Sequence, residues 1–404
     1  MITAISRASR QIPAAIWVLG LVSLLMDVSS EMIHALLPIY LVTVLGASAL
    51  TVGIIEGIAE ATAAITKVFS GALSDWLGKR QLLAAIGYGL AAFTKPVFPL
   101  AGSIGWVVAA RFIDRVGKGI RGAPRDALIA ALAPPQVRGA AFGLRQSLDT
   151  VGAFVGPLLA IAIMALTMDN FRAVFWVAVV PGFLSFALIA FAVKEPERPA
   201  AIRQVRAPLS MPELRRLGAA YWWVVAVAAV FTLARFSEAF LILRAQSVVL
   251  PLALIPAVLV LMNMVYALAA YPVGILSDKV DRLTALFIGF AILIVADLVL
   301  GLTSDIVGLA IGVALWGLHM GFTQGVLSTL VADAAPAELR GTAFGVFNLV
   351  SGIALLAASV TAGALWDIAG PEGTFLAGAV FTAIAFAGLL AVRGRLVAAR
   401  DKLS

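Results

Sequence analysis

Residues 14–44 read AAIWVLGLVSLLMDVSSEMIHALLPIYLVTV and form one long apolar stretch. A run of about 20 apolar residues is long enough to cross the hydrocarbon core of a bilayer as a helix. Lipid offers the backbone no hydrogen-bonding partner, so a spanning segment of this kind is expected to be helical. Asp27 and Glu31 interrupt the stretch, which is unlike the apolar region of a cleaved signal peptide. We interpret it as a retained first span.

The same apolar character extends over the whole chain. Of its 404 residues, 62% are hydrophobic and 13% are charged, and the mean hydropathy is +1.04. A soluble domain would carry about 25% charged residues. The chain has no cysteine, which excludes disulfides and thiolate metal sites. The pI near 10 does not indicate nucleic-acid binding, because the positive charge lies in short loops where membrane topology requires it.

Apolar stretches separated by short loops predict an all-α membrane protein with about twelve transmembrane helices. The predicted spans are 14–44, 51–73, 82–100, 104–131, 140–166, 173–193, 218–246, 251–276, 283–302, 306–331, 342–366 and 374–392. The longest loop is rich in Pro and Arg. It divides the chain into a predicted N-terminal six-helix half (1–193), a cytoplasmic linker (194–217) and a C-terminal six-helix half (218–404).

The distribution of Lys and Arg predicts the orientation of the chain. Outside the predicted spans these residues lie almost entirely in the linker, in both terminal segments and in the loops on the same side, whereas the opposite loops contain only Arg172. Cytoplasmic loops carry the excess of Lys and Arg. We therefore expect a multi-pass protein of the cell inner membrane with both termini in the cytoplasm.

Two sequence motifs recur at nearly the same offset. Residues 71–75 (GALSD) recur as 274–278 (GILSD), and residues 138–143 (RGAAFG) recur as 340–345 (RGTAFG). A parallel repeat of six spans is typical of transporters that alternate access by rocking two halves around a substrate site near mid-membrane.

With these motifs, the sequence resembles the major facilitator superfamily over its whole length. The signature after the second span is carried by Gly71, Asp75, Gly78, Lys79 and Arg80, although Trp76 stands where a basic residue is usual. Its copy keeps Gly274, Asp278, Lys279 and Arg282 but has Asp281 in place of a glycine. The resemblance implies that these residues form a conformational latch. Alternatively, this segment is an ordinary cytoplasmic turn whose basic residues only set the orientation of the chain. That would explain Lys79 and Arg80, but not the recurrence of Asp75 as Asp278.

The fifth predicted span resembles the motif of the proton-coupled antiporter branch. The matching residues are Gly143, Gly152, Gly156 and Pro157, and the glycine pair that usually closes the motif is Ala160 and Ile161 here. Arg111 stands where that branch carries an arginine in its fourth span. The resemblance implies proton-coupled export. Alternatively, Gly152 and Gly156 form an ordinary small-residue packing face.

Ionisable residues inside the predicted spans are concentrated in the N-terminal half. Each costs at least about 2.5–3.5 kcal/mol at the bilayer centre, so such residues mark functional sites by default. Asp27 and Glu31 are our candidates for the proton carrier, with Arg111 or Arg115 as the cation that switches the proton on or off. The candidate residues of the substrate cavity are His34, Glu56, Glu60, Lys95, Lys118, Arg145, Asp149, Arg235, Glu238 and Gln324. For any one residue, a permanent structural ion pair is the alternative.

We therefore expect a secondary transporter, most simply one that exports a small solute in exchange for protons. A symporter or exchanger that imports a small anionic metabolite is the alternative, because the fourth span carries a basic arc. An integral membrane enzyme would need carboxylates converging with His on a metal, and the sequence shows no such group. The expected partners are the solute, protons and lipid. We expect a monomer, no metal, no cofactor and no bound nucleic acid.

Overall fold

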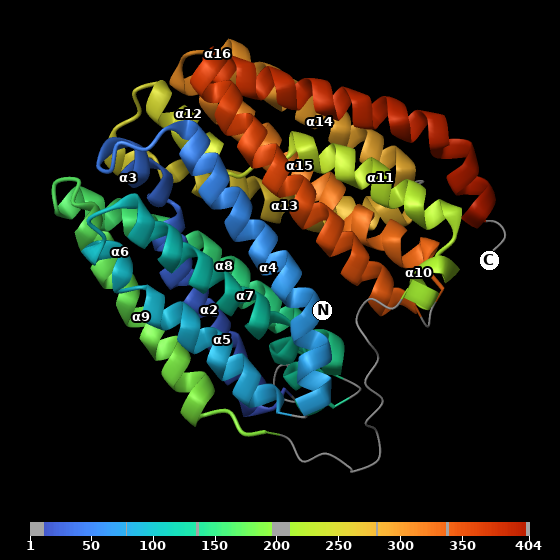
Figure 1. Ribbon diagram of the computed structural model, residues 1–404, viewed down its shortest axis with the longest axis horizontal. Coiled ribbons are helices and arrows are strands. Elements are labelled where there is room, and N and C mark those ends of the chain that lie inside the picture. Colours follow the sequence, from blue (N-terminus) through green and yellow to red (C-terminus); the bar gives the residue numbers. More distant parts are fainter. Residues whose placement is uncertain are drawn as a thin grey trace. The chain divides into compact units, whose positions relative to one another are not determined.

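The computed structural model describes residues 12–77, 79–134, 137–195, 211–279, 282–336 and 339–400. Within these ranges the chain forms helices joined by short turns, and no strand is present (Figure 1). The first helices are α2 (Ala14–His34), α3 (Leu37–Thr43), α4 (Ala49–Leu77), α5 (Arg80–Thr94), α6 (Val97–Leu100), α7 (Ile104–Leu132), α8 (Arg138–Leu166) and α9 (Phe171–Phe191).

The later helices are α10 (Met211–Arg216), α11 (Ala219–Ala234), α12 (Ala239–Ser247), the 3-10 turn η2 (Leu252–Leu254), α13 (Ala257–Lys279), α14 (Arg282–Leu302), α15 (Ile306–Ala334) and α16 (Arg340–Arg400). Ten stretches of the described chain are long and apolar enough to cross a membrane. One of them, Thr342–Ala391, is 50 residues long and holds two helices, because the chain turns at Gly370. Gly370 has φ +69°, which a residue without Cβ adopts readily.

Helix α7 is as long as the other spans but is not among those ten stretches, since its charged residues lower its hydropathy. With α7 and the two helices of the long stretch, the described chain supplies twelve spanning helices. The predicted all-α, twelve-helix architecture is therefore confirmed.

The chain divides into two compact units. The first unit takes in the described residues of Met1–Leu37 and Thr62–Ala207, and the second unit those of Pro38–Ala61 and Pro208–Ser404. Helix α4 thus contributes its beginning to the second unit and its end to the first. The predicted boundaries of the halves stay a prediction, since most of the linker (residues 196–210) lies outside the described residues.

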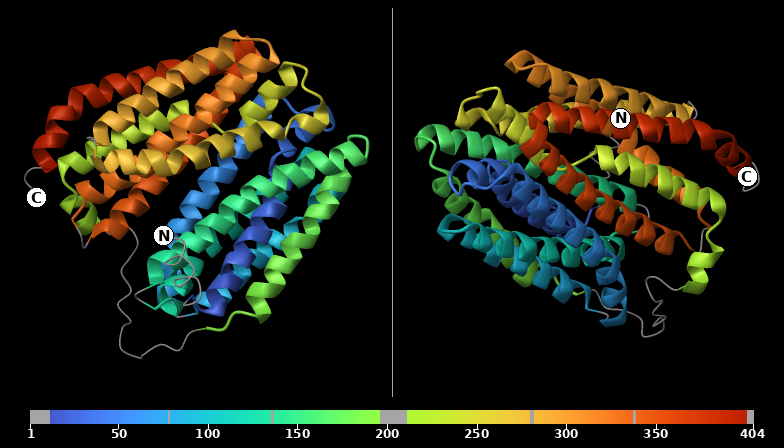
Figure 2. Two further views of the ribbon diagram at one scale, coloured as in Figure 1. Left: turned by 180° about the vertical axis from the view of Figure 1, so that it is seen from behind. Right: turned by 45° about the horizontal axis from the view of Figure 1, so that its top comes forward.

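In the first unit, α2 packs against α8 and α9, and α5 packs against α7 and α9 (Figures 1 and 2). The buried side chains between these helices include Leu19, Met26, Tyr88 and Leu128. In the second unit, α14 packs against α15 and α16, and α11 packs against α16. Phe231 stacks on Phe290 there, with ring centroids 4.2 Å apart.

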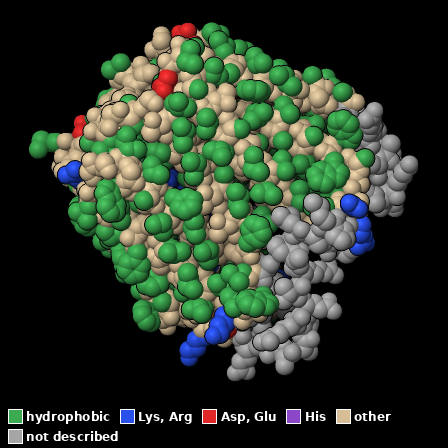
Figure 3. All heavy atoms as spheres, viewed as in Figure 1, with side chains coloured by type: hydrophobic (Ala, Val, Ile, Leu, Met, Phe, Trp, Pro, Cys, Tyr) green, Lys and Arg blue, Asp and Glu red, His purple; other side chains and the backbone are tan. Residues whose placement is uncertain are grey.

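The outer surface carries large apolar side chains. Phe93, Trp106 and Phe191 are all exposed, and on the face seen in Figure 3 hydrophobic side chains far outnumber charged ones among the described residues. A soluble protein rarely exposes such continuous apolar surface. The surface is therefore suited to contact with lipid.

Candidate functional site

A buried ion pair joins three helices of the first unit. Lys95, at the end of α5, donates from Nζ to Asp114 Oδ1 of α7 at 2.9 Å and to Ser30 Oγ of α2 at 3.0 Å. Arg115 Nε lies 3.9 Å from the other oxygen of Asp114. Lys95 is 2% exposed and Asp114 is 3% exposed. Because a buried charge is tolerated only with a partner, this group stabilises the packing of α2, α5 and α7 as long as it stays complete.

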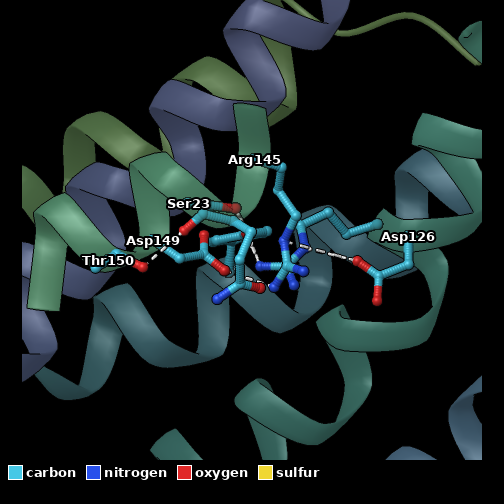
Figure 4. A network of polar contacts seen from close by, with 8 residues as sticks. Ser23, Asp126, Arg145, Asp149 and Thr150 are labelled. Carbon is cyan, nitrogen blue, oxygen red and sulfur yellow. Dashed lines mark hydrogen bonds and ion pairs between the residues drawn. The ribbon is translucent and has the colours of Figure 1, made fainter. Parts of the chain in front are cut away.

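A second polar network lies about three turns further along α7. Arg125 donates from Nη1 to Ser23 Oγ of α2 at 3.0 Å, and its Nε lies 3.3 Å from Asp126 Oδ1. Arg145 of α8 lies 3.9 Å from the same Asp126 oxygen and 2.5 Å from Asp149 Oδ2 (Figure 4). Figure 4 shows the Arg145 side chain between the two acids. The pair of Arg145 and Asp149, four residues apart on α8, therefore extends to α7 through Asp126.

The acids of α2 face the glycines of α8. A Cβ placed on Gly152 would lie 2.9 Å from the Cβ of Asp27, and a Cβ placed on Gly156 would lie 2.7 Å from the Cβ of Glu31. Both glycines also lie close to backbone carbonyl oxygens of α2. Cβ atoms essentially never come this close, so only glycine allows α8 to approach α2 at these two levels.

The two acids differ in their partners. His34 Nδ1 lies 3.3 Å from Glu31 Oε2, one turn away on the same helix. Asp27, by contrast, makes no hydrogen bond or ion pair with the described residues. Residues three apart on a helix are neighbours, so His34 is a local partner of Glu31.

The remaining N-terminal candidates have different environments. Arg111 and Arg115 are almost fully buried in α7, whereas Lys118 is exposed. Glu56 is buried and Glu60 is half-buried, and both belong to the part of α4 that is grouped with the second unit.

The C-terminal candidates lie in the second unit. Arg235 and Glu238 lie at the break between α11 and α12, and the Arg235 guanidinium is 5.9 Å from the ring centroid of Phe231. Gln324 of α15 accepts a hydrogen bond from the Tyr266 hydroxyl of α13 at 3.1 Å.

The predicted latch can be followed only in part. Gly71 of α4 faces Ala123 of α7 at an ordinary packing distance, Lys79 is exposed, and Arg80 donates to the carbonyl oxygen of Ala127 at 3.3 Å. Gly78 and the side chains of Asp75, Asp278 and Arg282 lie outside the described residues. The latch therefore stays a prediction.

The glycines of the antiporter motif differ in their surroundings. Gly152, Gly156 and Pro157 are buried in α8, whereas a Cβ on Gly143 would meet nothing within 4 Å. Helix packing thus explains Gly152 and Gly156 and does not explain Gly143.

Comparison with known proteins identifies the family. The sequence model of the Major Facilitator Superfamily matches residues 19–358 and 240–402. The chain belongs to this superfamily. An uncharacterised MFS-type transporter of Methanocaldococcus jannaschii is 34% identical over 394 residues, which cover 94% of this chain and 95% of the relative. The inner membrane transport protein YajR of Escherichia coli is 24% identical over 92% of this chain and 81% of its own length.

Solved structures show the same fold. A mutant of the peptide transporter POT superimposes with a TM-score of 0.79 at 16% identity, covering 95% of each chain. At this identity the similarity concerns the fold alone. The major facilitator architecture is thereby confirmed. Membership of the superfamily, shown by the sequence model, makes the protein a membrane transporter of a small-molecule substrate.

Sequence reasoning missed two acids that cap helices of this superfamily member. Both oxygens of Asp367 on α16 accept hydrogen bonds from the start of α4, at 3.0 Å each from the Ala49 and Leu50 N–H groups. Glu195 accepts from the Arg80 and Gln81 N–H groups at the start of α5, at 3.0 and 2.6 Å. Carboxylates are favourable at helix N-termini. No local signal indicated either acid, because each lies far in sequence from the helix that it caps.

Proposed function

We propose that this transporter is a secondary antiporter that exports a small solute in exchange for protons, with Asp27 and Glu31 as the proton-carrying acids. The observation that supports this best is the contrast between Asp27 and the other acids of the first unit. Asp114 and Asp149 have cationic partners within 3 Å, whereas Asp27 has none among the described residues. An acid that keeps a cationic partner stays ionised, so an acid without one is better suited to gain and lose a proton.

The surroundings of α2 support a switching role for nearby cations. Arg111 and Arg115 are buried in α7, which packs against α2. Arginine stays charged at any physiological pH. A shift of α7 that brings an arginine toward Glu31 or Asp27 would favour the ionised acid and release its proton. A shift away would favour the protonated acid.

The close approach of α8 to α2 would transmit such movements. Gly152 and Gly156 place the α8 backbone directly against Asp27 and Glu31. A movement of either acidic side chain would therefore also displace α8. This gives the antiporter motif a physical role that goes beyond packing alone.

We propose an inner-membrane location with both termini in the cytoplasm and a monomeric state. The distribution of Lys and Arg favours this orientation. The Escherichia coli relative is named as an inner membrane transport protein, which agrees with it.

Flux measurements in proteoliposomes test the proposal. A thermal-shift screen of lipophilic cations and small carboxylates would first identify a transported compound. Its flux is then measured under an imposed pH gradient, with a pH-sensitive dye inside the vesicles. We expect solute and protons to move in opposite directions. In Asp27→Asn, gradient-driven flux should be lost while solute exchange without a gradient persists. Asp169→Asn, in an exposed loop, is the matched control.

Import of a small anionic metabolite by symport is the second candidate. It is favoured by the buried guanidinium groups of Arg111, Arg115 and Arg121 along α7. Movement of solute and protons in the same direction in the flux assay would establish symport and rule out antiport.

A further inference from the structure

Asp297 of α14 is the most deeply buried acid without a partner in the described chain. Its exposed fraction is 0%, and neither carboxyl oxygen has a hydrogen-bond partner. It also forms no ion pair within 4.0 Å with any described residue. Nothing in the function proposed above uses this residue, which lies in the second unit.

The surroundings of Asp297 are apolar. A Cβ placed on Gly378 of α16 would lie 2.6 Å from Asp297 Oδ2 and 3.2 Å from the ring of Phe236, so the carboxyl lies directly against the α16 backbone beside an aromatic ring. Phe236 in turn packs against Trp316 of α15 and Phe375 of α16, with ring centroids 5.4 and 5.5 Å apart.

The charged and titratable groups of the neighbouring helices do not contact the Asp297 carboxyl group. They include His319 on α15, Tyr266 on α13, Asp367 and Glu372 on α16, Arg235 at the end of α11, and Arg244 of α12, which donates to the Leu300 carbonyl oxygen of α14 at 2.9 Å. None of them bonds to Asp297. His319 lies against the rings of Trp316 and Phe231, and Asp367 is engaged with the start of α4.

The protonation state follows from the relative cost of the two forms. An ionised carboxylate that is buried without a cation or a donor loses its hydration and gains nothing in return. The neutral acid leaves only one hydroxyl donor and weak acceptors unsatisfied, which costs several-fold less. The neutral form is therefore the stable one in this environment.

We propose that Asp297 is a second proton-binding site, in which the carboxyl is protonated in the state described here and exchanges its proton when α14 and α16 part. In that step the O–H bond breaks, the proton passes to an entering water molecule, and the electron pair stays on the carboxylate. The contribution of this site to transport rests on the proposed proton coupling. The protonation and exchange of Asp297 do not.

Infrared spectroscopy of the reconstituted protein tests the site without any transported ligand. The wild type at pH 7 should show the C=O stretching band of a protonated carboxyl, and Asp297→Asn should lack it. Asp169→Asn is the control and should keep the band. If Asp297→Asn does not fold, Asp297→Glu keeps a carboxyl group at the site and should shift the band rather than remove it.

Transfer to D₂O tests whether the site opens. We expect the band to shift as a deuteron replaces the proton while the protein stays folded, as checked by its unchanged thermal transition. A difference spectrum without a protonated band would overturn the proposal, because Asp297 would then be ionised. A band that stays unshifted in D₂O until the protein unfolds would also overturn it, by showing a closed structural acid. Failure of antiport would appear instead in the flux assay with Asp27→Asn, so the two proposals fail separately.

Discussion

Lys95 Nζ and Asp114 Oδ1 lie 2.9 Å apart in a part of the first unit where both side chains are almost fully buried. The two residues come from different helices, α5 and α7. Each charge has its counter-charge only because the helices pack in this arrangement. Removal of Asp114 therefore leaves Lys95 buried without this counter-charge, and removal of Lys95 leaves Asp114 with Arg115 at the longer distance of 3.9 Å.

Lys95→Met should destabilise the protein strongly. Loss of one partner of a buried ion pair costs about 3–5 kcal/mol. The measurement is the thermal unfolding transition of the purified protein in detergent. Lys118→Met is the matched control, because Lys118 is exposed on the same bundle, and it should leave the transition almost unchanged. The double variant Lys95→Met/Asp114→Leu should recover part of the loss. Equal transitions for the two lysine variants would show that the Lys95 pair contributes little to stability.

Gly156→Ala should separate α8 from α2. The added methyl group would lie 2.7 Å from the Cβ of Glu31 and 2.9 Å from the carbonyl oxygen of Val28, and the backbone cannot yield without a shift of the helix. Overpacking of this kind costs about 1–3 kcal/mol. Gly143→Ala is the control, because its methyl group would meet nothing within 4 Å. Thermal unfolding measures the difference, and a Gly143→Ala variant that is as unstable as Gly156→Ala would contradict this explanation.

Asp367→Ala should weaken the start of α4. The substitution removes the acceptor of two backbone N–H groups, and loss of a helix cap costs about 1 kcal/mol. Asp367→Asn keeps one acceptor oxygen and should lose less. The unfolding transitions of the two variants are compared with that of the wild type. If the Asn and Ala variants are equally unstable, the hydrogen bonds to Ala49 and Leu50 are not what stabilises this junction.

Glu31→Gln should abolish gradient-driven flux while leaving solute exchange intact. The amide is close to the acid in size but cannot bind or release a proton, so flux in this variant should no longer depend on the pH gradient. Glu372→Gln, at an exposed position of α16, is the control. Proteoliposome flux at a series of pH gradients provides the measurement. A wild-type response in Glu31→Gln would remove Glu31 from the coupling mechanism.

Contacts that are local in sequence were predictable. His34 lies three residues after Glu31, so helical periodicity alone places the two side chains together, as the 3.3 Å distance shows. The pair of Arg145 and Asp149, four residues apart, follows in the same way. Asp126 joins this pair from another helix, and its part could not be predicted, because helical spacing does not say which face of α7 turns toward α8.

By itself, the sequence determined that the chain crosses a membrane many times, which segments cross it, and that its first part carries most of the buried charge. It did not predict the breaks within spans, such as those between α2 and α3 and between α11 and α12. These properties are local, since a helix in lipid satisfies its backbone hydrogen bonds within one segment. Only the tertiary structure decided that Asp114 pairs with Lys95, that Asp367 caps α4, and that Asp297 has no partner among the described residues. Those outcomes depend on how each helix is rotated about its axis and which helix lies next to it. Charge pairs between helices of this kind are set by three-dimensional packing rather than by spacing along the chain.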